Sequence, residues 1–168
     1  MDPVTQRIAD GLVKAITAER EGQHFYRMAA AATEDRQGQQ TFQDLAADEL
    51  RHEEFLKAQY DAVVRTGKPD PGVKLAPPRQ FTHPIFSREL LKRAASAHYE
   101  MTALSIGIQL EMSAIRFYEA AAQASEDPAI RSFYGTLVLW EQGHLGALQR
   151  QAEELKEEYW SASGFSPM

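Results

Sequence analysis

Cysteine is absent from this chain of 168 residues. Its absence excludes a disulfide framework, a zinc site with cysteine ligands, an iron–sulfur cluster and a thiol nucleophile. The chain also lacks a run of about 18 apolar residues, which a membrane-spanning helix would need. Its first residues show no apolar core of a signal peptide. These absences predict a cytoplasmic protein that does not enter a membrane.

Basic residues are in the minority, because 18 Lys and Arg stand against 24 Asp and Glu, for a net charge of −6. Such a chain does not offer the basic surface that binds nucleic acid or an anionic membrane. Hydrophobic residues make up 43% of the sequence, which is enough to bury a core at this length. We therefore expect a single domain over residues 1–168.

Proline is scarce outside one segment, since five of the eight prolines lie between Pro69 and Pro84. Proline breaks helices, so this segment predicts an extended linker over residues 67–100. The flanking parts are rich in the helix formers Ala, Leu, Glu, Gln and Arg, and neither shows the alternation of a strand. Local breaks predict four main helices and a short additional one, at residues 4–34, 38–66, 101–125, 128–158 and 87–97.

The two halves of the chain repeat each other at a shift of 92 residues. The shift places Glu19 on Glu111 and Tyr26 on Tyr118, and the break at Asp35 falls on the break at Asp127. The fold predicted is all-α: a four-helix bundle in which one antiparallel hairpin (about 4–66) is used again (about 101–160). The Pro-rich crossover must run the length of the bundle, about 42 Å for a helix of this size.

The second helix of each hairpin contains the motif Glu-x-x-His, at Glu49/His52 and at Glu141/His144. Residues three apart share a helix face, so the carboxylate and the imidazole can converge on one point. The motif alone is weak evidence, because acidic residues and histidines also meet by chance on solvated helix faces. A third copy at residues 21–24 has no counterpart in the other half, so we discount it.

The two repeated motifs gain weight from their position in stripes of core spacing. On the second helices the stripes consist of Phe42, Leu45, Glu49, His52, Leu56, Gln59 and Val63, and of Tyr134, Leu137, Glu141, His144, Leu148, Gln151 and Leu155. Glu19 and Glu111 hold comparable core positions on the first helices. The alternatives are a solvated helix face and a satisfied polar network, but the exact repetition at matched height favours a metal site over both.

Four carboxylates and two imidazoles at one level of a core require compensation, because an unpaired buried carboxylate is costly. Two divalent cations balance four glutamates, and this oxygen and imidazole ligand set suits iron or manganese, with zinc as a substitute. The predicted metal ligands, which would also carry any catalysis, are Glu19, Glu49, His52, Glu111, Glu141 and His144. Tyr26 and Tyr118 either donate hydrogen bonds to ligating carboxylates or serve only as core aromatics.

One Glu from each of two helices, with Glu-x-x-His from each of the other two, is the ligand pattern of ferritin-like di-iron carboxylate bundles. The chain resembles that superfamily, and within it the rubrerythrins, over nearly its whole length outside the linker and the last residues. The segments that carry the resemblance are AEREGQHFY, LAADELRHEEF, QLEMSAIRFY and LWEQGHLGAL. The resemblance implies a ferritin-like fold, two iron ions and a homo-oligomer, for which a homodimer is common.

Two departures from the rubrerythrin pattern bear on activity. Rubrerythrins that reduce peroxide usually carry a rubredoxin domain with cysteine ligands, so a chain without cysteine needs a separate electron donor. They also carry a further Glu one turn beyond the third-helix ligand, where this chain has Ala114, and Gly22 follows Glu19 at the same spacing. The missing carboxylate counts against their peroxidase cycle and predicts open space for a ligand beside the metals.

The leading functional hypothesis is a di-iron oxidoreductase, ferroxidase-like or peroxidase-like, that uses O₂ or peroxide to oxidise Fe(II). The alternative is a non-catalytic iron-binding or storage protein of ferritin type, although nothing in the sequence identifies a cage-forming surface. A third reading is a bundle in which the metal only stabilises the fold.

Overall fold

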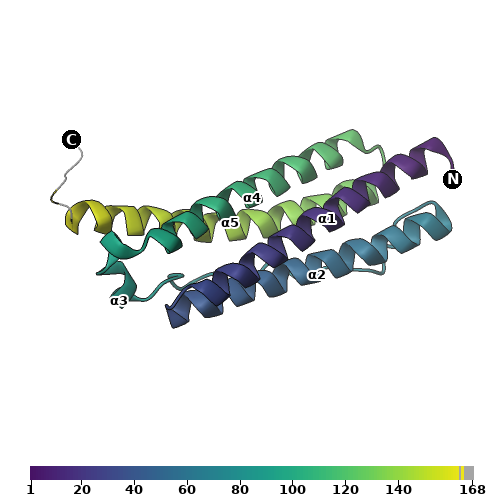
Figure 1. Ribbon diagram of the computed structural model, residues 1–168. Helices are drawn as coiled ribbons and strands as arrows, with labels where there is room; N and C mark the ends of the chain where they lie inside the picture. Colours follow the sequence, from purple (N-terminus) through teal and green to yellow (C-terminus); the bar gives the residue numbers. More distant parts are fainter. Residues whose placement is uncertain (163, 165–168) are drawn as a thin grey trace.

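Four long helices make up most of the computed structural model, which describes residues 1–162 and 164 (Figure 1). The end of the expected domain at residue 168 therefore lies outside the described residues. A short α-helix and one 3₁₀ turn precede the third long helix. The elements are α1 (Pro3–Ala32), α2 (Arg36–Thr66), α3 (Arg88–Leu91), the turn η1 (Ala94–Ser96), α4 (His98–Ala124) and α5 (Pro128–Ala162).

Side-chain caps fix where three of these helices begin. The Asp2 carboxylate accepts hydrogen bonds from the amides of Val4 and Thr5 at the start of α1, and Asp35 accepts from Gly38 at the start of α2. These caps satisfy amides that have no partner within the helix. At the start of α5, Asp127 accepts from the amide of Ala129 at 2.7 Å, and the first residue is proline as expected.

The helices pack as two hairpins, α1 with α2 and α4 with α5, which together form the predicted four-helix bundle. Figure 1 shows the segment after α2 returning along the bundle to α3, so that α1 and α4 both begin a hairpin but at opposite ends. The crossover thus runs the length of the bundle. Among the described residues, no helix has the length and apolar character that a membrane span requires.

Helix boundaries differ from the prediction near the crossover. The helix α4 begins at His98, three residues before the expected start, because the amide of Met101 already bonds to the carbonyl of Ala97. The early turn buries Glu100, which accepts a hydrogen bond of 2.8 Å from Thr33. The short helix expected at 87–97 divides into α3 and η1.

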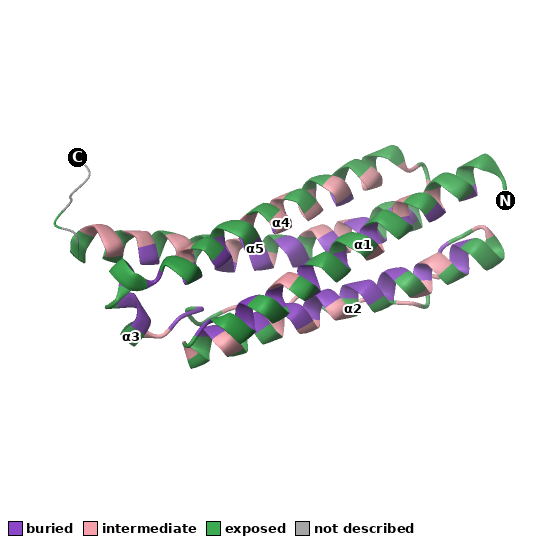
Figure 2. Cartoon of the chain, in the orientation of Figure 1, coloured by how far each residue is buried: buried purple, intermediate pink, exposed green. Residues whose placement is uncertain are grey.

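Two apolar clusters fill the bundle, one toward each end. Figure 2 shows buried residues along all four long helices. One cluster contains Tyr26 and Phe42 with the residues around α3, and the other contains Leu12, Tyr118 and Tyr134. Both predicted stripes on α2 and α5 are buried at every position. The Glu and His residues of these stripes therefore lie in the interior, between the two apolar clusters.

Buried glutamines fasten the crossover to the bundle at both of its ends. Gln59 of α2 donates to the carbonyl of Asp70 at 3.0 Å, and the amide of Asp70 donates back to Gln59 at 2.9 Å. At the other end the amide of Phe86 donates to Gln151 of α5 at 3.0 Å. Gln59 and Gln151 are 92 residues apart. The repeat therefore provides one buried glutamine that binds each end of the crossover, although the crossover itself is not repeated.

Candidate metal centre

The carboxylates and imidazoles expected at the site meet in the middle of the bundle. Two groups of buried side chains each bring four potential ligand atoms within 4.8 Å of one another: Glu19, Glu49, His52 and Glu141, and Glu49, Glu111, Glu141 and His144. All six predicted residues take part, and each of the four long helices contributes at least one. The discounted histidine, His24, is exposed.

The first group surrounds one nitrogen of His52. His52 Nδ1 is 3.1 Å from Glu19 Oε2 and 3.1 Å from Glu141 Oε1. Glu49 Oε2 lies 3.3 Å from the same nitrogen. Three carboxylate oxygens from three helices thus converge with one imidazole nitrogen.

The second group repeats this arrangement around His144. His144 Nδ1 is 3.1 Å from Glu141 Oε2, 3.4 Å from Glu49 Oε1 and 3.7 Å from Glu111 Oε1. Glu49 and Glu141 therefore present one oxygen to each group, whereas Glu19 and Glu111 each belong to one group only. This is the geometry of two shared and two terminal carboxylates.

The hydrogen-bond donors within the site are too few for these oxygens. Each Nδ1–H can donate one good hydrogen bond, yet three carboxylate oxygens lie around each nitrogen. Within the described part of the chain, Glu141 Oε1 is buried and has no hydrogen-bond partner, although it lies 3.1 Å from His52 Nδ1, the nitrogen that also faces Glu19 Oε2. A cation at each position would satisfy these oxygens together. The donor set, carboxylate oxygens with one imidazole per position, fits a pair of divalent metal ions.

Two of the carboxyl groups bind their protons more tightly than an ordinary carboxyl group does. Burial raises the pKa of Glu19 and that of Glu111 well above the ordinary value of 4.5, and the charges of Glu141 and Glu49 raise both further. For Glu49, burial also acts to raise the pKa, but hydrogen bonds from His144 and His52 outweigh it and lower the pKa. Without metal, these shifts favour the neutral form of Glu19 and Glu111 and the ionised form of Glu49.

The other shared carboxylate and the two imidazoles form a compensating set of charges. Burial opposes ionisation of Glu141, yet His52 and His144 lower its pKa. Burial likewise opposes charge on His52, but Glu141 raises the pKa of His52 well above 6.5. The pKa of His144 is raised against burial by Asp48, Glu111, Glu141 and Glu49. The raised pKa values of the two imidazoles and the lowered values of Glu49 and Glu141 favour opposite charges on these side chains, which compensate one another inside the bundle.

Two buried tyrosines tie the hairpins together at the site. The hydroxyl of Tyr26 donates to Glu111, and the hydroxyl of Tyr118 donates to Glu19. Both tyrosines are fully buried. Of the two roles considered for these residues, the structure favours hydrogen bonding to the terminal carboxylates, and each bond crosses from one hairpin to the other.

A cavity of about 280 Å³ opens onto the site between α1 and α4. Its lining includes Glu19, Glu49 and Glu111, together with Gly22 and Ala114. These small residues stand where the sequence predicted open space, and a cavity lies there. The interior of the bundle is therefore accessible to a small molecule from this side.

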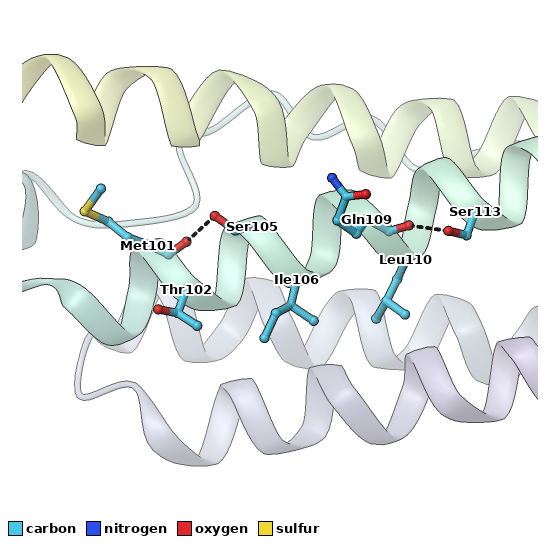
Figure 3. A pocket seen from close by; sticks show the side chains of 7 residues that line it. All are labelled: Met101, Thr102, Ser105, Ile106, Gln109, Leu110 and Ser113. Carbon is cyan, nitrogen blue, oxygen red and sulfur yellow. Dashed lines mark hydrogen bonds between the residues drawn. The ribbon is translucent and has the colours of Figure 1, made fainter.

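The cavity adjoins a shallow hollow of about 530 Å³ on the outer face of α4 (Figure 3). The two share Leu110 and Ser113. Figure 3 shows Thr102, Ile106 and Leu110 extending from the same side of the helix, while Ser113 bonds back to the carbonyl of Gln109 at 2.7 Å. No residue that lines the hollow carries a charge.

Sequence reasoning missed the residues behind the two histidines. Asp48 is fully buried and lies 3.4 Å from His144 Nε2. Trp140, which had no recognisable role in the sequence, stacks edge-on against His52 at 4.9 Å between ring centroids. The position of Asp48 next to the predicted ligand Glu49 was a signal in the sequence. Asp48 was nevertheless overlooked, because the residue that corresponds to it in the second half is Trp140 and the comparison of the two halves considered only matching residues.

Comparison with known families agrees with the resemblance to rubrerythrins that the sequence motifs indicate. The family model described as Rubrerythrin matches residues 10–152, a span that contains all six residues of the two groups. Comparisons with curated proteins and with solved structures gave no match.

Proposed function

Since the chain belongs to the rubrerythrin family, we propose that it is a di-iron oxidoreductase that uses O₂ or peroxide to oxidise Fe(II). The observation that carries the proposal is the sharing of Glu49 and Glu141 between the two groups. Shared carboxylates place two cations next to each other, which is the arrangement of paired-metal catalysis.

The residues of this chain have separable tasks in such a site. Glu49 and Glu141, which belong to both groups, would help to hold both metals, and His52 and His144 would each help to hold one of them. Tyr26 and Tyr118 fix the terminal carboxylates by donating a proton in a hydrogen bond to each. Bound iron would supply the electrons and the open coordination positions that O₂ or peroxide requires.

The cavity between α1 and α4 supports a route for the oxidant. It reaches Glu49 and Glu111 directly, so a small molecule that enters there meets one carboxylate that belongs to both groups and one that belongs to a single group. Gly22 and Ala114 leave this route open, because neither has a side chain long enough to close it.

After iron has been oxidised, the electrons that reduce it again would come from a donor outside these residues, because thiolate-bound iron cannot form where there is no cysteine. We also propose that the chain forms a homo-oligomer, such as a homodimer. The apolar side chains exposed on α1 and α4 support this, among them Val13, Met28 and Ile106.

Fe(II) oxidation under O₂ and under peroxide tests the proposal. The variants Glu49→Ala and His144→Ala should lose the reaction. The matched control is His24→Ala, because His24 belongs to the third Glu-x-x-His copy but is exposed and outside both groups. Unchanged oxidation in both site variants would refute the proposal.

Iron content separates catalysis from storage. About two irons per chain after loading agree with a dinuclear redox site, whereas tens of irons per chain would indicate storage. A bundle in which metal has only a structural role would gain thermal stability on metal binding without turnover.

A further inference from the structure

The surroundings of the two histidines differ at one pair of positions. The 92-residue repeat relates Glu49 to Glu141, His52 to His144 and Gln59 to Gln151. It also relates Asp48 to Trp140, so an acidic residue in the first hairpin corresponds to an aromatic residue in the second. The bundle thus builds two similar ligand groups on unequal supports.

His144 is held by a carboxylate through the nitrogen that faces away from the site. Asp48 Oδ2 lies 3.4 Å from His144 Nε2. Asp48 is itself held by Arg79 of the crossover, at 3.3 Å, and by Arg51. The ring of Phe81, also from the crossover, packs edge-on against His144 at 5.7 Å.

His52 has no comparable support. Its Nε2 is buried and has no hydrogen-bond partner among residues 1–162 and 164. Trp140 covers that side, but its Nε1–H donates to the carbonyl of Ala76 in the crossover at 2.9 Å. The crossover occurs once in the chain, so it strengthens the support of one histidine and leaves the other with ring packing alone.

We propose that the two metal positions are unequal: the position at His144 binds first and more tightly, and the position at His52 exchanges more readily. A carboxylate that accepts the Nε2–H fixes the tautomer with its lone pair on Nδ1 and makes that nitrogen a stronger ligand. Loss of such a partner typically weakens metal binding about 10–100-fold. His52 must instead bury an N–H without an acceptor when its Nδ1 binds metal.

The charges behind Asp48 do not reverse this preference. Arg79 also pairs with Asp44 at 2.9 Å, so the two arginines are balanced by the two aspartates. Arg51 and Arg79 are partly exposed, at 42% and 32% of their side-chain surface, and water screens their charge. The direct contact of Asp48 with His144 is therefore the decisive difference.

Substoichiometric loading with Co(II) tests this inference, because Co(II) stands in for Fe(II) without being oxidised by air under ordinary conditions. Crystals of the full chain given one equivalent of metal would be measured at the cobalt absorption edge. We expect anomalous density mainly at His144 Nδ1, and a two-step titration with affinities at least about tenfold apart. Equal occupancy, or a preference for His52, would overturn the inference.

The variants Asp48→Ala and Asp48→Asn test the cause. Alanine should remove the difference between the two positions, whereas asparagine, whose amide oxygen can still accept from Nε2, should keep part of it. Asp44→Ala is the matched control, since it removes a partner of Arg79 that does not touch His144. If Asp48→Ala does not fold, the asparagine variant and the wild-type occupancies still decide the question.

This inference rests on the proposed two-metal site, but the two can fail separately. A wild-type chain that takes up no cobalt at either histidine would contradict the site itself. Two positions that fill together would contradict only the inequality.

Discussion

Tyr118 of the second hairpin donates its phenolic hydrogen to Glu19 of the first hairpin. The repeat produces the reciprocal bond from Tyr26 to Glu111. Each hairpin therefore positions the terminal carboxylate of the other, and the site depends on the two being docked. The same bonds supply buried phenols with the acceptor that their hydroxyls require.

The variant Tyr118→Phe should weaken metal binding about 10–100-fold, because Glu19 loses the donor that orients it. Competition with a chelator of known affinity measures the effect. The control is Tyr134→Phe, since Tyr134 is buried and stacks on Tyr118 but lies outside both groups. Equal losses in the two variants would mean that packing, rather than the hydrogen bond, is responsible.

The shared and terminal carboxylates should differ in the number of metals lost. Glu49 serves both groups and Glu19 serves one. We therefore expect Glu19→Gln to retain about one metal per chain and Glu49→Gln to lose most of both, as judged from ligand number. Metal analysis after gel filtration gives the stoichiometry. Equal retention by the two variants would contradict the assignment of Glu49 as a ligand of both metals.

The stability of the metal-free protein should fall as the pH rises. The folded state raises the pKa of Glu19 and Glu111 above 4.5 and that of His52 and His144 above 6.5. At pH values between the ordinary pKa and the raised pKa of a group, the folded state binds more protons than the unfolded state. Within that pH range, each additional bound proton makes the free energy of unfolding fall by about 1.4 kcal/mol for every unit by which the pH rises.

Thermal unfolding of chelator-treated protein from about pH 6 to about pH 8 measures this dependence. The midpoint should decrease with pH, and excess divalent metal should reverse the trend, because metal binds the deprotonated ligands. A metal-free midpoint that is flat or rises over this range would show that these groups do not hold their protons in the folded state.

Ala114→Leu should slow oxidation without changing metal content, because the longer side chain occupies the cavity between α1 and α4. Stopped-flow oxidation of the loaded protein measures the rate. Ala31→Leu is a suitable control, since Ala31 is an exposed residue of α1 outside the cavity. A rate equal to that of the control would place the oxidant's entry elsewhere.

The sequence alone was sufficient to predict the bundle and the meeting of six polar residues. The reason is the repeat: identical residues 92 positions apart, at core spacing, leave few ways to bury Glu49 and Glu141 except together. The partners of Tyr26 and Tyr118 could not be read from spacing within a helix, since each bond joins helices from different hairpins. Their direction depends on how the hairpins dock.

Features that break the repeat were the ones missed. Asp48 and Trp140 have no matching counterpart, and their partners Arg79 and Ala76 lie in a segment without periodicity. The start of α4 at His98 was missed for a similar reason, because Glu100 is buried through a bond to Thr33 at the far end of α1. Contacts of this kind follow from tertiary packing and leave no local pattern.

The most direct test of the account is anomalous scattering at the iron edge from crystals of the Fe-loaded chain. The account predicts two peaks about 3.5–4 Å apart, one beside Nδ1 of His52 and one beside Nδ1 of His144, with Glu49 and Glu141 between them. A single peak, or iron bound away from these four residues, would contradict it.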